Sequence, residues 1–296
     1  MAPDALPLFF GPTADDCIPV WAAARGTSAA VPYFKPLEWQ GQMFLDGGFK
    51  LNCPSACAYS EAKCIWPDKR CDVLLSLGTG RAMNRQQPPV KKNLFRLAYA
   101  VADDMTNAEE AWTKFKMELP RKDGIFRLTP AYSGSGFALD ECQKLNEIER
   151  QAEAWIATQN SPLTHICHQL IAALFFFRLL GPAEGGMQVG EIVCRLPVGL
   201  EVRQKLIDHM LLKGSKLFVV EFEGCPPETR LIVNAPPALR RLDATDELCL
   251  RVEPLNLSAT GATKIHIRMQ SLDMHQLGDA EKWLPISGSP YPIQEF

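Results

Sequence analysis

The sequence lacks a long uninterrupted apolar run. Its longest apolar stretch, Leu170 to Leu180, is broken by Arg178, whereas a membrane-spanning helix needs about 20 apolar residues. The first residues, Met-Ala-Pro-Asp-Ala-Leu-Pro, contain no positively charged region followed by an apolar one, so we expect no secretory signal. These absences predict a soluble, cytoplasmic protein.

An excess of basic residues is also missing. The 31 Lys and Arg residues are outnumbered by 34 Asp and Glu residues, so we expect no nucleic-acid partner. The ten cysteines are scattered, and Cys53, Cys57, Cys64 and Cys71 lack the short paired spacing of a zinc site. Disulfide frameworks belong mainly to short secreted domains. We therefore expect free thiols, no metal and no cofactor.

The composition and the positions of Gly- and Pro-rich segments divide the chain into parts. Hydrophobic residues make up 47% and charged residues 22% of 296 residues, which is enough for one large domain or two ordinary ones. Residues 1–17 are proline-rich and irregular, and residues 181–186 form a Gly- and Pro-rich linker. We expect residues 18–180 to form one domain and residues 187–296 a second one.

Residues 18–180 combine helical and strand patterns, which is typical of the α/β class. The segment 72–77 is largely apolar, as in a strand buried on both faces. With the strand before Asp46 and the helix between them, it predicts a right-handed βαβ unit. We expect helices over 18–30, 54–66, 93–117, 139–156 and 162–180, and a strand over 125–128. The last helix places Phe175, Phe176 and Phe177 in the core.

The second domain has a different pattern of apolar and polar residues. Short and often alternating runs, separated by Pro, Gly and Asp, predict antiparallel strands, and residues 264–269 alternate throughout. We expect a mainly β module of the sandwich type. Its expected strands are 188–196, 216–222, 230–234, 247–252 and 263–269, with one helix over 203–212.

The turn that follows Met43-Phe44-Leu45 is the first candidate for a catalytic site. This apolar run delivers Asp46 to a turn made by Gly47 and Gly48, which tolerate positive φ and a close approach to a ligand. Pro54 suits the first turn of the helix that follows. A strand end that presents a carboxylate suits a catalytic base. The alternative is a β-hairpin, for which Asp-Gly between apolar residues is a strong signal.

A second glycine-containing turn follows the segment 72–77. Gly78-Thr79-Gly80 lies where ligand sites of parallel sheets form, beyond the carboxyl end of a strand. We expect Asp46 and this turn to lie at the same edge. A phosphate cradle is the less favoured interpretation, because no Lys-Ser/Thr follows the glycines.

These segments resemble the patatin-like phospholipases, in particular the fungal type. The block Trp21 to Pro36 resembles the one that precedes the catalytic aspartate of that family. Asp46-Gly47-Gly48 is similar to its Asp-Gly-Gly/Ala motif, and Ser76-Leu77-Gly78-Thr79-Gly80 to its Ser-Leu/Ile-Gly-Thr-Gly. Asn52-Cys53-Pro54 resembles its Asn-Asn-Pro, with Cys53 in place of the second asparagine. The resemblance covers about residues 18–160.

The resemblance implies a three-layer α/β fold and a Ser-Asp dyad that cleaves acyl esters of lipids. Asp46 corresponds to the general base, and Gly47 and Gly48 shape its turn. Asn52, Pro54, Gly78, Thr79 and Gly80 support the motifs.

The sequence departs from the family at the nucleophile. The motif Gly-x-Ser-x-Gly presents the serine on a strained turn, but the glycine pairs spaced four apart enclose Ala183 and Gln188. The Gly-Gly-Gly-x-Arg-Gly loop that resembles an oxyanion hole is absent as well. We assign Ser28 to helix packing and Ser133 and Ser135 to a flexible loop. We therefore expect a partial patatin-like domain without its first strands and nucleophile elbow.

Two hypotheses follow. The first is a lipid acyl hydrolase represented here by its aspartate-bearing half, inactive unless the N-terminal half is supplied, with a lipid or phospholipid ester as substrate. The second is a non-catalytic binding or regulatory module derived from that fold. In either case the β module is a candidate surface for a protein partner or for peripheral contact with a membrane.

Overall fold

Neither of the two units of the computed structural model is continuous in sequence. The first unit comprises residues 1–62 and 85–122, and the second comprises 63–84 and 123–296. Residues 181–186, predicted to link two domains, fall inside the second unit, and the domain division itself stays a prediction. The structure describes residues 18–30, 33–49, 51–83, 108–120, 123–134, 137, 141–182, 188–196, 201–212, 216–226, 229–234, 248–255, 262–270 and 283–292.

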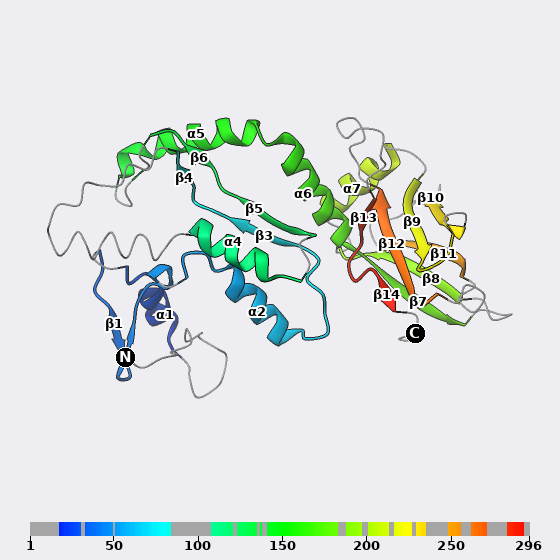
Figure 1. The fold of residues 1–296 in the computed structure, drawn as a ribbon, viewed down its shortest axis with the longest axis horizontal. Coiled ribbons are helices and arrows are strands. Elements are labelled where there is room, and N and C mark those ends of the chain that lie inside the picture. Colours follow the sequence, from blue (N-terminus) through cyan, green and yellow to red (C-terminus); the bar gives the residue numbers. More distant parts are fainter. Residues whose placement is uncertain are drawn as a thin grey trace. The chain divides into compact units, whose positions relative to one another are not determined.

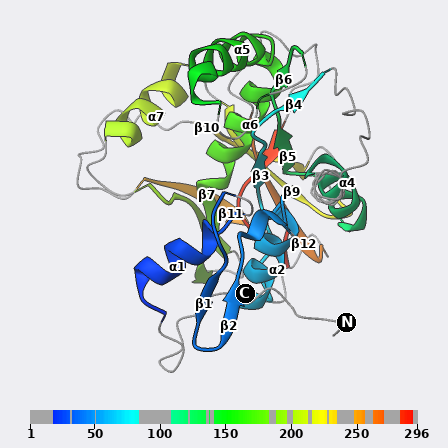
Figure 2. The ribbon, with the colours of Figure 1, turned by 90° about the vertical axis from the view of Figure 1, so that its left-hand side faces the viewer.

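The first unit is built on a helix and a hairpin (Figure 2). Its helix α1 (Val20–Thr27) contacts β1 (Leu37–Trp39), which pairs antiparallel with β2 (Gln42–Phe44). Gln40 and Gly41 form the connecting turn with φ of 49° and 75°. Positive φ at both central residues is the geometry of a type I′ turn, whose twist matches that of the strands. The hairpin turn therefore lies at Gln40-Gly41 and not at Asp46-Gly47.

Aromatic side chains hold the helices of the first unit together. The helix α2 (Ser55–Ile65) begins in this unit, and α4 (Ala108–Glu118) follows later in the chain. Trp112 and Phe115 of α4 are buried, and the Phe115 ring meets Tyr59 of α2 edge to face at 5.8 Å. The predicted helix over 93–117 is confirmed from residue 108, and its earlier part lies outside the described residues.

The second unit starts with parallel strand pairs. β3 (Leu74–Leu77) pairs with β5 (Ile125–Leu128), and β4 (Arg81–Ala82) pairs with β6 (Ala131–Tyr132) (Figure 1). The parallel pairing supports the predicted α/β character. Among the described strands, however, β2 shares a sheet only with β1. Because β2 belongs to the first unit and β3 to the second, the predicted βαβ unit of β2 and β3 stays a prediction.

A helical stretch separates these strands from the rest of the second unit. It consists of η2 (Cys142–Lys144), α5 (Leu145–Ala157) and α6 (Asn160–Ala173). The predicted helix over 162–180 is wrong beyond Ala173, because the strand β7 (Phe175–Pro182) follows and pairs with β8 (Gln188–Cys194). Aromatic residues favour strands, and an apolar run alone does not distinguish a buried strand from a buried helix.

Two antiparallel sheets complete the second unit (Figure 1). One has the order β11-β8-β7, and the other has the order β10-β9-β12-β13 with β14 also paired to β12. The helix α7 (Glu201–Leu212) precedes the second sheet in the chain. The remaining strands are β9 (Lys216–Phe222), β10 (Leu231–Asn234), β11 (Cys249–Leu255), β12 (Lys264–Gln270), β13 (Trp283–Pro285) and β14 (Tyr291–Pro292).

Both antiparallel sheets bury side chains in one core. Phe175 of β7 meets Phe218 of β9 edge to face at 5.1 Å. The alternation predicted for residues 264–269 is confirmed, because Ile265, Ile267 and Met269 are buried and the residues between them are not. Burying these side chains removes them from water and stabilises the fold. The sandwich class of this module stays a prediction.

Candidate active site

The Asp46 carboxylate lies at the end of the hairpin strand β2, in a half-buried position. Its Oδ1 accepts a hydrogen bond from the Gly48 N–H at 2.7 Å. Gly47 begins the short 3-10 helix η1 (Gly47–Phe49), and its carbonyl accepts the Leu51 N–H at 2.8 Å. This turn fixes the carboxylate orientation through its own backbone, since a hydrogen bond to a carboxylate is stronger than one between neutral groups.

Gly47 and Gly48 differ in conformation from the prediction of positive φ. Neither has the positive φ that the sequence suggested, because the turn is helical. A Cβ on Gly48 would lie 3.0 Å from Oδ1 of Asp46, whereas a Cβ on Gly47 would meet nothing within 4 Å. Gly48 therefore allows the close approach of its own backbone to the carboxylate, and Gly47 is under no such steric demand.

The backbone of Asp46 is anchored to the segment that follows α1. Its N–H donates to the Ala29 carbonyl at 3.2 Å. Ala22, Gly26 and Ala29 are buried, so the small residues of this segment allow close packing, as expected. Arg25 reaches the Lys35 carbonyl at 2.6 Å through Nη2. The block 21–36, which carries part of the resemblance, thus supports the candidate base.

The segment Asn52-Cys53-Pro54 leads from the turn into α2. The carbonyl of Pro54 accepts the Ala58 N–H at 2.9 Å, so Pro54 lies at the start of the helix as predicted. The Cys53 thiol is buried and contacts the Ser55 hydroxyl at 3.4 Å. Cys53 therefore has a packing role at the position where the family carries asparagine.

The predicted turn Gly78-Thr79-Gly80 follows β3, whose last two residues are Ser76 and Leu77. The Gly78 N–H donates to the Leu128 carbonyl at 2.7 Å, which continues the parallel pairing beyond β3. Ser76 is buried and accepts a 2.7 Å hydrogen bond from Arg127. Gly80 has φ of 114°, and a Cβ there would lie 1.9 Å from the Tyr132 ring. This turn requires glycine at residue 80 for both conformation and space.

Asp46 belongs to the first unit, and Gly78, Thr79 and Gly80 belong to the second. Each motif is positioned by its own unit. That both lie at one edge of a ligand site therefore stays a prediction.

Serine hydroxyls and cysteine thiols can act as nucleophiles, and several of them lie among the described residues. The Ser28 hydroxyl donates to the Arg25 carbonyl at 3.3 Å, which agrees with its assignment to the end of α1. The Ser133 hydroxyl contacts Oε1 of Gln151 at 3.0 Å, and Ser135 lies outside the described residues. Burial raises the pKa of the Cys71 and Cys194 thiols, so their reactive thiolate forms are disfavoured at neutral pH.

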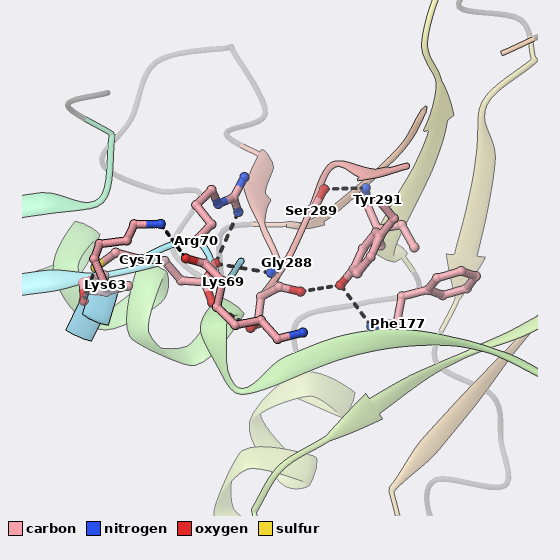
Figure 3. A network of polar contacts seen from close by, with 12 residues as sticks. Lys63, Lys69, Arg70, Cys71, Phe177, Gly288, Ser289 and Tyr291 are labelled. Atoms are coloured by element: carbon pink, nitrogen blue, oxygen red, sulfur yellow. Dashed lines mark hydrogen bonds and ion pairs between the residues drawn. The ribbon is translucent and has the colours of Figure 1, made fainter. Parts of the chain in front are cut away.

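Sequence reasoning missed a polar network that joins the two ends of the second unit (Figure 3). Oδ2 of Asp72, just before β3, accepts the Ser287 hydroxyl at 2.6 Å, and Oδ1 accepts the Gly288 N–H at 3.2 Å. The Tyr291 hydroxyl donates to the Ser287 carbonyl and accepts the Phe177 N–H at 3.0 Å. Contacts between such distant residues leave no local signal in a single sequence.

In the described part of the chain, a metal site would be visible as a cluster of ligands and a membrane span as a long apolar helix. No cluster of three or more His, Cys, Asp or Glu side chains there is arranged to hold a metal ion. None of its helices has both the length and the apolar character required to cross a bilayer.

About half of the chain is similar to curated phospholipases. It is 31% identical to mouse calcium-independent phospholipase A2-gamma over 150 residues, which is 50% of this chain and 19% of the relative. The human protein of the same name is 33% identical over 140 residues, 46% of this chain and 18% of the relative. Phospholipase A I of Arabidopsis thaliana is 28% identical over 159 residues, 51% of this chain and 12% of the relative.

These matches support the resemblance to patatin-like phospholipases at about 30% identity over half the chain. This chain spans less than a fifth of the length of each of these relatives. No family model matches the chain, and the fungal type stays a prediction.

Proposed function

We propose that this chain supplies the general base of a patatin-like lipid acyl hydrolase and that Asp46 is this base. The observation that carries the proposal is the Asp46 turn, in which the Gly48 N–H fixes Oδ1 at 2.7 Å. The similarity of half the chain to phospholipases supports it independently. The proposed substrate is the acyl ester bond of a lipid or phospholipid.

The two oxygens of the Asp46 carboxylate have different roles in the proposed reaction. Because Gly48 binds Oδ1, Oδ2 is the atom that receives the proton of a serine hydroxyl. The serine Oγ then bonds to the ester carbonyl carbon, and the proton passes from Asp46 to the departing alcohol. Water then attacks the acyl carbon and gives its proton to Asp46. The bond between the acyl carbon and the serine Oγ breaks, Oγ takes the proton back from Asp46, and the fatty acid leaves. General-base catalysis requires hydrogen-bond reach between these groups, and a positioned base contributes about 10²–10⁴-fold in rate.

The serine must come from outside these 296 residues, because no Gly-x-Ser-x-Gly occurs in them. The chain by itself therefore does not hydrolyse esters. The test is the release of fatty acid from phosphatidylcholine by the purified chain, together with labelling by a fluorophosphonate that captures activated serines. We expect neither reaction. Hydrolysis that Asp46→Ala abolishes would show that a serine within the chain is the nucleophile.

The missing nucleophile motif also favours a second candidate from another class. The chain would then be a non-catalytic binding or regulatory module that engages a protein or membrane partner through its β strands. The intact mass of the native protein in cell extract discriminates the two. A mass well above 32.9 kDa, with a peptide carrying Gly-x-Ser-x-Gly, favours the enzyme. A mass of 32.9 kDa favours the module.

A further inference from the structure

A concave site lies on the five-stranded sheet of the second unit. It encloses about 190 Å³ and is lined by Glu221, Cys225, Thr229, Arg230, His266 and Arg268, among others. Glu221 alternates along β9 with the buried Val220 and Phe222, and His266 and Arg268 alternate along β12 with buried residues. Because successive strand side chains point to opposite faces, these polar groups lie on the face opposite the core.

One carboxylate holds two guanidinium groups in this site. Oε1 of Glu221 lies 2.6 Å from Nε of Arg230, and Oε2 lies 3.3 Å from Nη1 of Arg268. The Glu221 side chain is only 17% exposed, whereas those of Arg230 and Arg268 are 51% and 40% exposed. The carboxylate thus fixes each arginine from the sheet side and leaves part of each guanidinium open to solvent.

The charge of the site is unbalanced. Among the described residues that line the cavity, two guanidinium charges face one carboxylate charge, which leaves one positive charge in excess at neutral pH. The neighbouring Lys264 and Glu223 form a 3.4 Å ion pair of their own and add no net charge. His266 lies directly opposite Glu221 in the pairing of β12 with β9. Its imidazole ring, which can form hydrogen bonds, also lines the cavity.

We propose that this site binds a phosphate group. Arginine presents several N–H donors in a planar fork that matches the oxygens of a phosphate, and Glu221 holds two such forks beside one cavity. The Thr229 hydroxyl, which donates to the Pro226 carbonyl at 2.7 Å, lies in the same lining. The ligand is a phosphate carried either by a lipid headgroup or by a small soluble molecule. This site is distinct from Asp46 and does not depend on the proposed hydrolysis.

The competing explanation is an ion-pair network that only fastens β10 and β12 to β9. This explanation predicts no affinity for phosphate, because each guanidinium group would then bind only Glu221. Titration of the whole chain with inorganic phosphate, followed by calorimetry, separates the two. We expect saturable binding that weakens as salt rises. An Arg230→Ala/Arg268→Ala variant should bind at least tenfold more weakly, because it loses the charge-assisted hydrogen bonds to the phosphate.

The matched control is Arg178→Ala, which removes an arginine paired with Glu191 at 3.0 Å on the other antiparallel sheet. We expect this variant to bind phosphate as the unchanged chain does. Arg230→Lys/Arg268→Lys keeps both charges in case the alanine variant unfolds, and it should bind more weakly because an ammonium cannot form two parallel bonds. The absence of phosphate binding, or equal binding by all variants, would overturn the proposal.

Sedimentation with vesicles identifies the source of the phosphate. The chain is mixed with phosphatidylcholine vesicles that contain or lack phosphatidic acid, whose headgroup is a phosphate monoester. Sedimentation that needs phosphatidic acid and is lost in Arg230→Ala/Arg268→Ala assigns a lipid headgroup. Binding of inorganic phosphate without sedimentation assigns a soluble ligand. Failure of both measurements contradicts the site and leaves the role of Asp46 untouched.

Discussion

The Ser287 hydroxyl donates to Oδ2 of Asp72 at 2.6 Å, a hydrogen bond between residues 215 positions apart in the sequence. Gly288 binds the other carboxylate oxygen, and Arg70 lies 3.2 Å from it. The loop before β14 is thereby fastened to the residue that leads into β3. Since β3 ends at the Ser76–Gly80 motif, the C-terminal segment supports a strand that bears part of the proposed hydrolase signature.

We expect Asp72→Ala to lower the free energy of unfolding by about 1–3 kcal/mol, because it leaves the partners of a half-buried carboxylate without an acceptor. Ser287→Ala should cost about 1 kcal/mol, the usual worth of one hydrogen bond. Urea denaturation of the purified chain checks both values. The control is Asp68→Ala, which removes an exposed carboxylate. Equal stability of Asp72→Ala and Asp68→Ala would contradict the role of the network.

The raised pKa of Tyr291 leads us to expect a loss of folding stability at alkaline pH. Burial raises the pKa of Tyr291 from its ordinary value of 10.0 to about 12, against the opposing hydrogen bond from the Phe177 N–H. The folded state therefore holds the phenol proton more tightly than the unfolded state does. This contribution is fully present below about pH 10 and is lost as the pH rises through about 12, and it amounts to about 2–3 kcal/mol.

Thermal unfolding between about pH 9 and pH 12 checks this prediction. The Tyr291→Phe variant lacks the titrating hydroxyl, so its midpoint should fall less steeply across that range. A variant with the same alkaline slope as the unchanged chain would show that Tyr291 does not titrate as expected.

The lowered pKa of His266 leads us to expect a smaller loss of folding stability at acidic pH. Burial lowers the pKa of His266 below its ordinary 6.5, and Arg268 lowers it further, whereas Glu223 and Glu221 oppose the shift. The unfolded state then binds the proton more readily. The stability due to neutral His266 is present above about pH 6.5 and is lost as the pH falls through the folded-state pKa. His266→Gln should reduce the fall in thermal midpoint between about pH 7.5 and pH 5. An unchanged fall would contradict the shift.

Gly80→Ala tests the turn after β3. Its φ of 114° is unfavourable for a residue with a Cβ, and that Cβ would lie 1.9 Å from the Tyr132 ring. We expect a loss of about 1–3 kcal/mol in the free energy of unfolding, measured by urea denaturation. The control is Gly47→Ala, where a Cβ meets nothing within 4 Å. A Gly80→Ala variant as stable as Gly47→Ala would show that the turn does not require glycine.

Local patterns in the sequence predicted much of the fold. The alternation of residues 264–269 identified a strand with one buried face, because its period of two is distinctive. The strand β3 was expected from its apolar run, and the start of α2 from Pro54. The Asp46 turn was located correctly, but its physical basis is the approach of the Gly48 backbone to the carboxylate, and not positive φ.

What the sequence did not reveal depends on contacts between distant residues. Phe175, Phe176 and Phe177 continue an apolar helix pattern, and only pairing with β8 makes them a strand. Gly190 illustrates this, because a Cβ there would lie 2.2 Å from the Phe177 ring. The same holds for the hydrogen bond between Asp72 and Ser287 and for the ion pairs of Glu221 with two arginines. Both form only when the folded chain brings distant residues together.

The most direct test of Asp46 as the general base is a chimera. In mouse calcium-independent phospholipase A2-gamma, the part matched by this chain is replaced by residues 18–296, which keep the bonds from Ser287 and Gly288 to Asp72, so that the relative supplies the nucleophile. The measurement is fatty-acid release from phosphatidylcholine, with Asp68→Asn as the matched control. We predict activity that Asp46→Asn lowers by at least about 10²-fold, the lower range for loss of a positioned base, and that Asp68→Asn leaves intact. An Asp46→Asn chimera as active as the Asp68→Asn chimera would contradict the assignment.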